Sequence, residues 1–400
     1  MDIAVTNTSQ ARPPRTRRHP PFECVALTLQ GGGALGAYQA GVYQALDEAG
    51  IHPNWLAGIS IGAINATIIA GNPPESRVAR LREFWTTVTA NPIWGALADH
   101  VGRLAENVAA RRLVNQSSAQ TAALAGVPGF FEPRRLPPFI VTPGSAAATS
   151  WYDTGALRRT LERLVDFDRI NAGAPRLSVG AVNIKTGNFV YFDNTTHKLT
   201  LAHVMASGAL PPSFPAVEID GEHYWDGGTV SNTPLQWVLQ YGPRRDTLVF
   251  QVDLWNARGA LPRDIFDVET RRKEIIYSSR TRDNVDRFVQ MQRLRHAIAK
   301  VCEKLPKELC DIPEAEILRR FADQKVYSIV HLIYRSRDYE GCAKDYAFSR
   351  RSMEDHWNAG YADMMHTFEH PEVLTRPASG DGVATFDVAA QAHSVEAGRS

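Results

Sequence analysis

Cysteine is scarce in this 400-residue sequence, and long apolar runs are missing from it. None of the four cysteines belongs to a C-x-x-C pair, so the sequence has neither a disulfide framework nor a zinc-ligand spacing. The longest apolar stretches, such as residues 61–70, are far shorter than the roughly 18 to 20 residues of a spanning helix, and the N-terminus has no apolar signal core. We therefore expect a cytoplasmic protein that is soluble or contacts membranes only peripherally.

An excess of either charge is also missing. Lysine and arginine number 44 against 43 aspartates and glutamates, which gives a net charge of +1 and no global field that would attract nucleic acid. The sequence is 44% hydrophobic and 22% charged, a composition typical of a globular protein with a substantial core. Clusters of Asp or His that would suggest calcium or zinc are not evident, so we expect no metal and no other cofactor. The sequence does not indicate an oligomeric state.

Changes in periodicity divide the chain into four segments. Residues 1–22 carry four arginines and several prolines without apolar periodicity, and are expected to form a disordered basic tail. Residues 23–240 are expected to form the main domain, with a proline-, alanine- and serine-rich insertion at 90–150. Residues 241–376 are interpreted as an α/β extension packed on that domain, and the glycine- and alanine-rich residues 377–400 as a flexible tail.

Two consecutive strand and helix pairs predict the fold class. An apolar run at residues 25–29 is followed by a helical pattern at 34–49, which closes on Gly50. A second strand at 55–59 leads directly into an apolar helix at 61–70. This β-α-β-α order predicts an α/β protein with a mostly parallel sheet. Further strands at 177–183, 247–254 and 325–334, a charged helical stretch at 264–304 and a last helix at 352–368 extend the pattern.

Ser60 is the candidate nucleophile. It stands at the centre of a G-x-S-x-G motif with Gly58 and Gly62, between a predicted strand and a predicted helix, where this motif indicates a nucleophile elbow. The sharp turn brings backbone atoms so close together that a Cβ at either glycine would obstruct it, and the helix start places N–H groups beside the hydroxyl. A purely structural serine in a tight turn is the alternative.

The glycine run after the first strand is a candidate oxyanion hole. If the two strands are neighbours, Gly31, Gly32 and Gly33 open on the same sheet edge as Ser60, where their N–H groups can approach a developing oxyanion. Together with Gly36, this run also satisfies the G-x-G-x-x-G dinucleotide fingerprint. That fingerprint requires an acidic residue at the end of the second strand, and Ser60 occupies that place. We therefore favour the oxyanion hole.

A third motif reveals a family resemblance. The Asp226-Gly227-Gly228 element would by itself be ordinary turn chemistry. In the order of the glycine run, then the Ser60 motif, then Asp226-Gly227-Gly228, however, the sequence resembles the patatin-like phospholipases over about residues 25–239. The resemblance implies a three-layer α/β/α fold and a serine hydrolase that acts on acyl esters of lipids. It also implies Ser60 as nucleophile, Asp226 as base without a histidine, and the glycine run as oxyanion loop.

One position departs from the family pattern, and two other functions stay open. Many relatives carry a basic residue where this chain has Leu35, which leaves the backbone donors unaffected. An α/β-hydrolase with a Ser-Asp-His triad is the first alternative, with His296, His331 and His356 as candidates downstream of Asp226. The second is a non-catalytic protein of lipid droplets or storage granules that has kept the fold.

Overall fold

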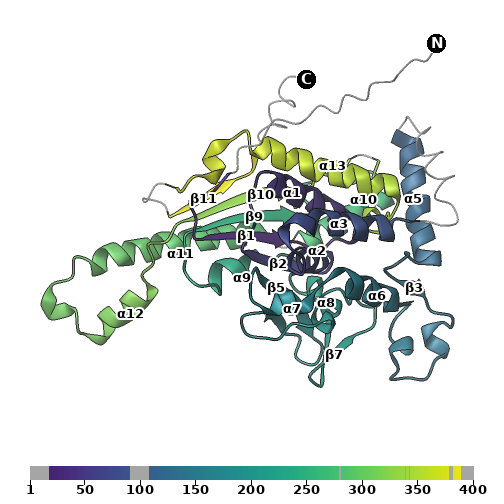
Figure 1. Ribbon diagram of the computed structural model, residues 1–400, viewed down its shortest axis with the longest axis horizontal. Coiled ribbons are helices and arrows are strands. Elements are labelled where there is room, and N and C mark those ends of the chain that lie inside the picture. Colours follow the sequence, from purple (N-terminus) through teal and green to yellow (C-terminus); the bar gives the residue numbers. More distant parts are fainter. Residues whose placement is uncertain are drawn as a thin grey trace, which may run out of the picture.

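The computed structural model describes residues 18–90, 108–278, 281–337, 339–341, 343–377 and 382–388 (Figure 1). In these ranges a nine-stranded sheet has the order β11-β10-β9-β1-β2-β5-β8-β7, and β6 also pairs with β5. The strands are β1 (Cys24–Leu29), β2 (Trp55–Ile59), β5 (Arg176–Asn183), β6 (Phe189–Asp193), β7 (Val217–Ile219), β8 (Glu222–Asp226), β9 (Thr247–Asp253), β10 (Tyr327–Ile333) and β11 (Val383–Phe386). A separate small sheet joins β3 (Glu132–Pro133) to β4 (Tyr152–Asp153).

The helices in the described ranges connect and cover these strands. They are α1 (Ala37–Glu48), α2 (Ile61–Ala70), α3 (Pro74–Val88), α5 (Val108–Ala125), α6 (Gly155–Leu164), α7 (Phe167–Asn171), α8 (Leu201–Ser207), α9 (Leu235–Gln240), α10 (Ile265–Tyr277), α11 (Thr281–Cys302), α12 (Pro313–Phe321) and α13 (Arg350–Thr367). Short 3-10 helices include η1 (Gly33–Gly36), η2 (Pro138–Ile140), η3 (Ala146–Ala148), η4 (Gly227–Thr229) and η6 (Lys344–Tyr346).

Most of the sheet is parallel, which brings distant loops to one edge. β1 lies between β2 and β9 and is parallel to both, with Leu29 opposite Gly58 on one side and Val252 on the other. β8 is antiparallel to β5, but Asp226 at the end of β8 lies opposite Ala181, which is close to the carboxyl end of β5. The carboxyl ends of β1, β2 and β9 therefore share an edge with the end of β8. This edge is the usual place for a site in an open α/β sheet.

Both faces of the sheet are covered, which confirms the α/β fold with a central, mostly parallel sheet. Along β1 the side chains alternate, so that Leu27 and Leu29 enter a large core with α1, α2 and α3, whereas Ala26 enters a smaller core with α9 and α11. On the face with the larger core, α1 packs closely against α13. The contact is so close that a Cβ at Gly41 would lie 1.9 Å from the Trp357 carbonyl oxygen. Figure 1 shows α1 and α13 side by side above the strands.

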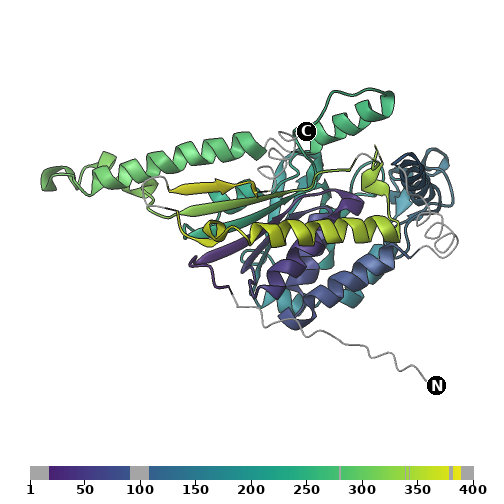
Figure 2. The ribbon, with the colours of Figure 1, turned by 90° about the horizontal axis from the view of Figure 1, so that it is seen from above.

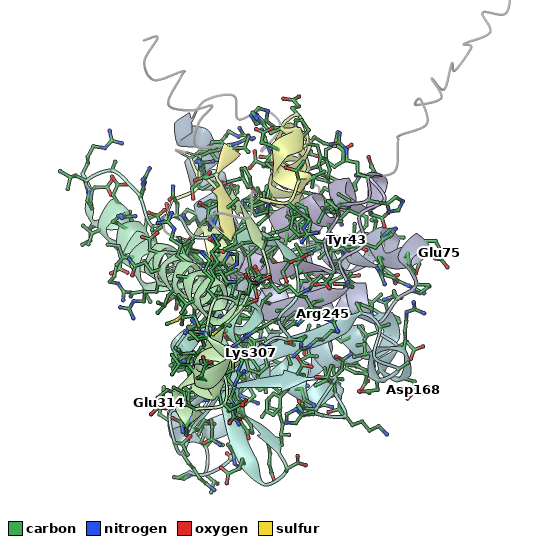
Figure 3. All side chains as sticks on the ribbon, turned by 90° about the vertical axis from the view of Figure 1, so that its left-hand side faces the viewer. Tyr43, Glu75, Asp168, Arg245, Lys307 and Glu314 are labelled. Atoms are coloured by element: carbon green, nitrogen blue, oxygen red, sulfur yellow. The ribbon has the colours of Figure 1, made fainter. Side chains whose placement is uncertain are left out.

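Several elements differ from the sequence expectations. The helical stretch expected at 264–304 consists of two helices, α10 and α11. An additional helix, α12, follows α11, and together they form an arm that projects from the sheet (Figures 1 and 2). Figure 3 looks at the molecule from the arm's side, with Lys307 and Glu314 labelled on it. α12 escaped the sequence reading although it is amphipathic, because only nine residues carry the pattern.

The predicted tails are partly structured. Within the segment 377–400, expected to be flexible, residues 383–386 form β11, which pairs in parallel with β10 from Tyr327 to Val330. The expectation was wrong here because a Val-Ala-Thr-Phe run in a glycine- and alanine-rich context gains its stability from the sheet edge, which the composition does not reveal. At the other end, Arg18 of the expected basic tail donates a hydrogen bond to the Phe368 carbonyl oxygen (3.1 Å) and lies over its ring. Residues 1–17 lie outside the described part of the chain.

Candidate active site

Ser60 has the backbone conformation of a nucleophile elbow. It connects β2 directly to α2 with φ 57° and ψ −126°, a combination that residues other than glycine seldom adopt. The two flanking glycines are sterically required, because a Cβ at Gly58 would lie 2.3 Å from the Gly62 carbonyl oxygen, and a Cβ at Gly62 would lie 2.2 Å from that of Leu29. The turn therefore presents the Ser60 side chain at the carboxyl edge of the sheet.

A second serine fixes the backbone of the first. Ser207, the last residue of α8, accepts a hydrogen bond from the Ser60 backbone N–H through its Oγ atom at 3.0 Å. Ser207 is completely buried, which shields its Oγ atom from competing water molecules. The sequence contained no signal for this role, because the two serines are 147 residues apart.

Asp226 is a buried carboxyl group beside Ser60. It is 1% exposed, its Oδ1 atom accepts a hydrogen bond from the Gly228 N–H at 2.7 Å, and its Oδ2 atom has no well-aligned hydrogen-bond partner among the described residues. Burial raises the pKa of Asp226 from 3.8 to about 7, although the Ser60 side chain and the Gly228 N–H partly offset this rise by stabilising the carboxylate. Such a group can accept a proton near neutral pH.

The glycine turn packs directly against Ser60. A Cβ at Gly31 would lie 3.0 Å from the Ser60 Cβ atom, and one at Gly33, where φ is +56°, would lie 2.3 Å from the Asp345 carbonyl oxygen. The Gly31 N–H donates a long hydrogen bond of 3.4 Å to the Asn232 carbonyl oxygen. Within the described ranges the N–H groups of Gly32 and Gly33 have no hydrogen-bond acceptor.

Three polar side chains hold this turn in place. The Gly31 carbonyl oxygen accepts hydrogen bonds from Asn232 Nδ2 at 3.0 Å and from Trp255 Nε1 at 2.9 Å. The buried Gln30 amide accepts from the Leu254 and Trp255 N–H groups through Oε1. Both amides, of Gln30 and Asn232, donate to the Tyr277 carbonyl oxygen at 3.0 Å. Apart from the Asn232 segment, which belongs to the family resemblance, the sequence reading missed these groups because their contacts are long-range.

A pocket opens above these groups. The space between its walls, including the open mouth, is about 690 Å³. Ser60, Asp226 and the Gly31 to Gly33 turn lie on its polar side. The rest of the wall is largely aliphatic and aromatic, and it includes Ile61, Ile64, Phe130, Phe131, Leu210, Phe214, Tyr346 and Phe348. The four phenylalanines of this wall also contact each other ring to ring. The structure thus brings together all the catalytic and oxyanion candidates from three distant motifs.

The downstream histidines do not join this pocket. His296 contacts the Lys325 carbonyl oxygen through Nε2 at 3.0 Å, and His356 contacts Glu340 at 3.1 Å. His331 lies within β10. None of the pocket-lining residues in the described chain is a histidine. The geometry therefore gives the Ser-Asp-His alternative no partner for Ser60.

Comparison with known families decides the identity of the fold. The model of the family described as patatin-like phospholipase matches residues 27–238, just over half of the chain. The chain belongs to the patatin-like phospholipase family. A second model, described as patatin phospholipase, matches residues 275–380, so the likeness to patatin families continues into the C-terminal part.

Two individual relatives match this chain in short stretches. A patatin-like phospholipase domain-containing protein of Caenorhabditis elegans is 33% identical over 75 residues, 19% of this chain and 7% of the relative. Lysophospholipase nte1 of Aspergillus terreus is 52% identical over 46 residues, 12% of this chain and 3% of the relative. The chain therefore aligns with less than a tenth of the length of either relative. The crystal structure of VipD from Legionella pneumophila aligns with 89% of this chain and 67% of its own at 15% identity, with a TM-score of 0.38.

Two features of the described residues concern metals and membranes. These residues contain no group of three or more His, Cys, Asp or Glu side chains that is placed to hold a metal ion. No helix in the same ranges is long and apolar enough to cross a bilayer.

Proposed function

We propose that this patatin-like phospholipase is a serine hydrolase of lipid acyl esters that works through a Ser60 and Asp226 dyad. Family membership implies a lipid acyl hydrolase, and the dyad is the finer assignment. The observation that supports the dyad is the buried Asp226 carboxyl group beside Ser60. Burial raises the pKa of this carboxyl group to about 7. A carboxyl group with an ordinary pKa of 3.8 would be a weak base at neutral pH.

The proposed reaction begins when Ser60 Oγ attacks the ester carbonyl carbon and its proton passes to Asp226. The carbonyl oxygen becomes an oxyanion that the free N–H groups of Gly32 and Gly33 stabilise, a contribution of about 100- to 1000-fold in rate for each donor in other hydrolases. When the tetrahedral adduct collapses, Asp226 returns the proton to the leaving alcohol, and an acyl-enzyme is left on Ser60. Water then repeats the sequence and releases the fatty acid.

The pocket wall supports an acyl chain as the group that is transferred. On one side lie the reacting groups, and next to them the cluster of Phe130, Phe131, Phe214 and Phe348 offers an apolar surface. Burial of methylene groups against such a surface stabilises binding by about 0.8 kcal/mol each. Asp345, the second carboxyl group of the lining, is paired with Lys273.

Active-site substitution and labelling test this proposal. Ser60→Ala and Asp226→Asn are each expected to abolish ester hydrolysis, whereas alanine at His296, His331 or His356 leaves it. Folded wild-type protein should be labelled by a serine-reactive fluorophosphonate, and Ser60→Ala should not. Absence of labelling in the folded wild type would contradict the proposal and would favour a non-catalytic role. Loss of activity in a folded histidine variant would replace the dyad by a triad.

The substrate class follows from a comparison of four ester types. Hydrolysis of phospholipids, glycerides, acyl thioesters and a storage polyester should be measured with Ser60→Ala as the blank. We expect phospholipid or lysophospholipid to be cleaved fastest, in line with the family. Addition of a chelator should not change the rate, because the proposed steps use no metal ion.

A further inference from the structure

Helix α10 exposes an apolar stripe beside the pocket. None of its residues is buried, and its apolar side chains Ile265, Val268, Ile275 and Ile276 are between 44% and 68% exposed. At 3.6 residues per turn these four positions, with the exposed Arg272 among them, fall within an arc of roughly 100° on one side of the helix. An arc of this width is what a helix normally buries against a partner. In the described structure it faces outward.

A second apolar surface belongs to residues 134–151. This segment exposes Leu136, Phe139, Ile140 and Trp151 by 49% to 80%. The segment itself has no acidic residue. Arg135 is exposed and has no ion-pair partner among the described residues, whereas Arg134 is largely buried and pairs with Asp153 at 3.4 Å. Exposed aliphatic and aromatic side chains, a tryptophan and an exposed arginine are the composition of a surface that rests in the headgroup region of a bilayer.

Both surfaces border the same pocket. Backbone hydrogen bonds from the Trp151 N–H to Pro212 and from the Tyr152 N–H to Ser213 fasten the 134–151 segment to the loop that carries Leu210 and Phe214 of the pocket wall. α10 ends at Tyr277, which also lines the pocket. Figures 1 and 2 agree that α10, α5 and β3 lie at one end of the molecule, opposite the α11–α12 arm.

We propose that the α10 stripe and the 134–151 segment dock this protein on an anionic phospholipid surface, so that lipid enters the pocket directly from the bilayer. The proposal rests on the proposed function for the nature of its substrate. A bilayer is favoured over a second copy of the chain because the exposed Arg135 side chains of two such segments would repel each other, whereas anionic headgroups attract this side chain.

The inner side of α10 connects the docking surface to the glycine turn. Lys273 pairs with Asp345 at 2.8 Å and Glu274 pairs with the buried Lys344 at 2.8 Å, so α10 is tied to η6 by two ion pairs. The Asp345 carbonyl oxygen in turn packs against Gly33 of the proposed oxyanion turn. A bilayer that holds α10 therefore also supports the wall of the site.

Vesicle flotation tests the proposal. Full-length Ser60→Ala protein, chosen so that no lipid is hydrolysed, is mixed with vesicles of phosphatidylcholine and phosphatidylglycerol. Two double variants in this background, Phe139→Ser with Ile140→Ser and Ile265→Ser with Ile275→Ser, are each expected to lower the bound fraction roughly tenfold or more, because each removes two apolar side chains from the interface. A third arm with pure phosphatidylcholine is expected to bind more weakly.

The matched control is Ile317→Ser with Phe321→Ser on α12, whose side chains are 56% and 52% exposed on the distant arm. This control should float like the parent. Equal binding by all variants, or an equal loss in the control, would overturn the docking surface. Light scattering that shows a dimer in the parent and monomers in the surface variants would also overturn it in favour of self-association.

A soluble short-chain ester separates this proposal from the proposed function. With Ser60 intact, both surface variants should hydrolyse the dissolved ester at the wild-type rate, since none of the four residues lines the pocket. If wild type binds vesicles through these residues but hydrolyses no ester, the proposed function fails and the docking surface stands. If it hydrolyses the ester but the variants bind vesicles unchanged, the docking surface fails alone.

Discussion

At the scale of single residues, the chemistry of the site depends on how much water reaches one carboxyl group. Asp226 is buried at the end of β8, and this burial is the first cause of its raised pKa. In water the same side chain would be ionised at all neutral pH values and would hold a proton weakly. In the proposed mechanism, the exclusion of solvent is what makes this carboxyl group a base near neutral pH.

The pH dependence of catalysis follows from that carboxyl group. Because the ionised form is the base, kcat/KM should rise with pH through a midpoint near 7 and fall about tenfold for each pH unit below it. The measurement is a pH–rate profile on a soluble ester. A profile that stays flat from pH 5 to about 8 would contradict the assignment of Asp226 as base.

The stability of the fold should respond to the same group in the opposite sense. The folded-state pKa of Asp226 lies above its unfolded value, so the folded protein loses stability as pH rises from about 4 to 7, because over this range the unfolded state releases a proton that the buried group keeps. Asp226→Asn removes this cost and should stabilise the inactive protein at pH 8 by about 2 to 4 kcal/mol relative to wild type. Denaturant unfolding at pH 5 and pH 8 checks this, and the difference between the two proteins should shrink at pH 5.

Ser207 gives a second prediction at the residue scale. Ser207→Ala would leave the partly buried Ser60 N–H without this acceptor, and kcat is expected to fall on the order of tenfold, with KM changed little. The control is Ser178→Ala. Ser178 is also a buried serine, but its hydroxyl accepts a hydrogen bond from Trp55 and donates one to Asp193. This variant should lower Tm without lowering kcat. Equal kcat values in the two folded variants would show that Ser207 has no special effect on the nucleophile.

At the scale of elements, the glycine turn is defined by two constraints that act at the same residue. Gly33 has a positive φ, and it also touches the Asp345 backbone. Gly187, in the turn between β5 and β6, has a similar φ of +69° but open space around it. A comparison of substitutions at Gly33 and Gly187 therefore separates the effect of a positive φ from the effect of a steric clash.

We expect Gly33→Ala to lower kcat by about 100-fold or more, because the turn must move to admit the new Cβ and its N–H groups lose their alignment. Gly187→Ala should cost about 1 kcal/mol of stability and leave kcat unchanged. Rates on a soluble ester and Tm values of both proteins provide the comparison. Wild-type kcat in Gly33→Ala would mean that this turn does not supply the oxyanion donors.

Local signals explain which elements the sequence could predict. β2 and α2 have the expected bounds, because an apolar run that ends in a G-x-S-x-G turn leaves little choice of conformation. The break between α10 and α11 went unnoticed, since charged residues continue the helical pattern across it. Gln30 and Trp255 could not be assigned from sequence either, because their hydrogen bonds join residues more than 200 positions apart. The pairing of Ser60 with Asp226 came from the family pattern, and the sheet order that places them together came only from the structure.

At the scale of the whole molecule, β11 closes one edge of the sheet. Its four residues pair with β10, which would otherwise present unpaired backbone groups next to the buried Ile329 and Val330. The larger sheet therefore depends on a strand that follows every other described element of the chain.

Truncation after residue 377 removes that strand. We expect Tm to fall by roughly 5 °C and aggregation on warming to increase, because the exposed edge of β10 can pair with other molecules. Truncation after residue 388 keeps β11 and serves as the control. Static light scattering during thermal unfolding measures both effects, and identical behaviour of the two truncations would argue against a stabilising role for β11.

The position of β9 beside β1 also has a consequence for how the protein is made. β9 and the segments after it supply Trp255, Tyr277, Asp345 and Phe348 to a pocket whose proposed nucleophile is residue 60. During synthesis the ribosome therefore releases Ser60 long before the walls around it exist. A nascent chain of 240 residues would carry the whole patatin-like match but only part of the pocket, so the proposed lipid-cleaving activity would begin only once translation is nearly finished. Because the pocket is assembled late, an incomplete chain would not hydrolyse cellular lipids.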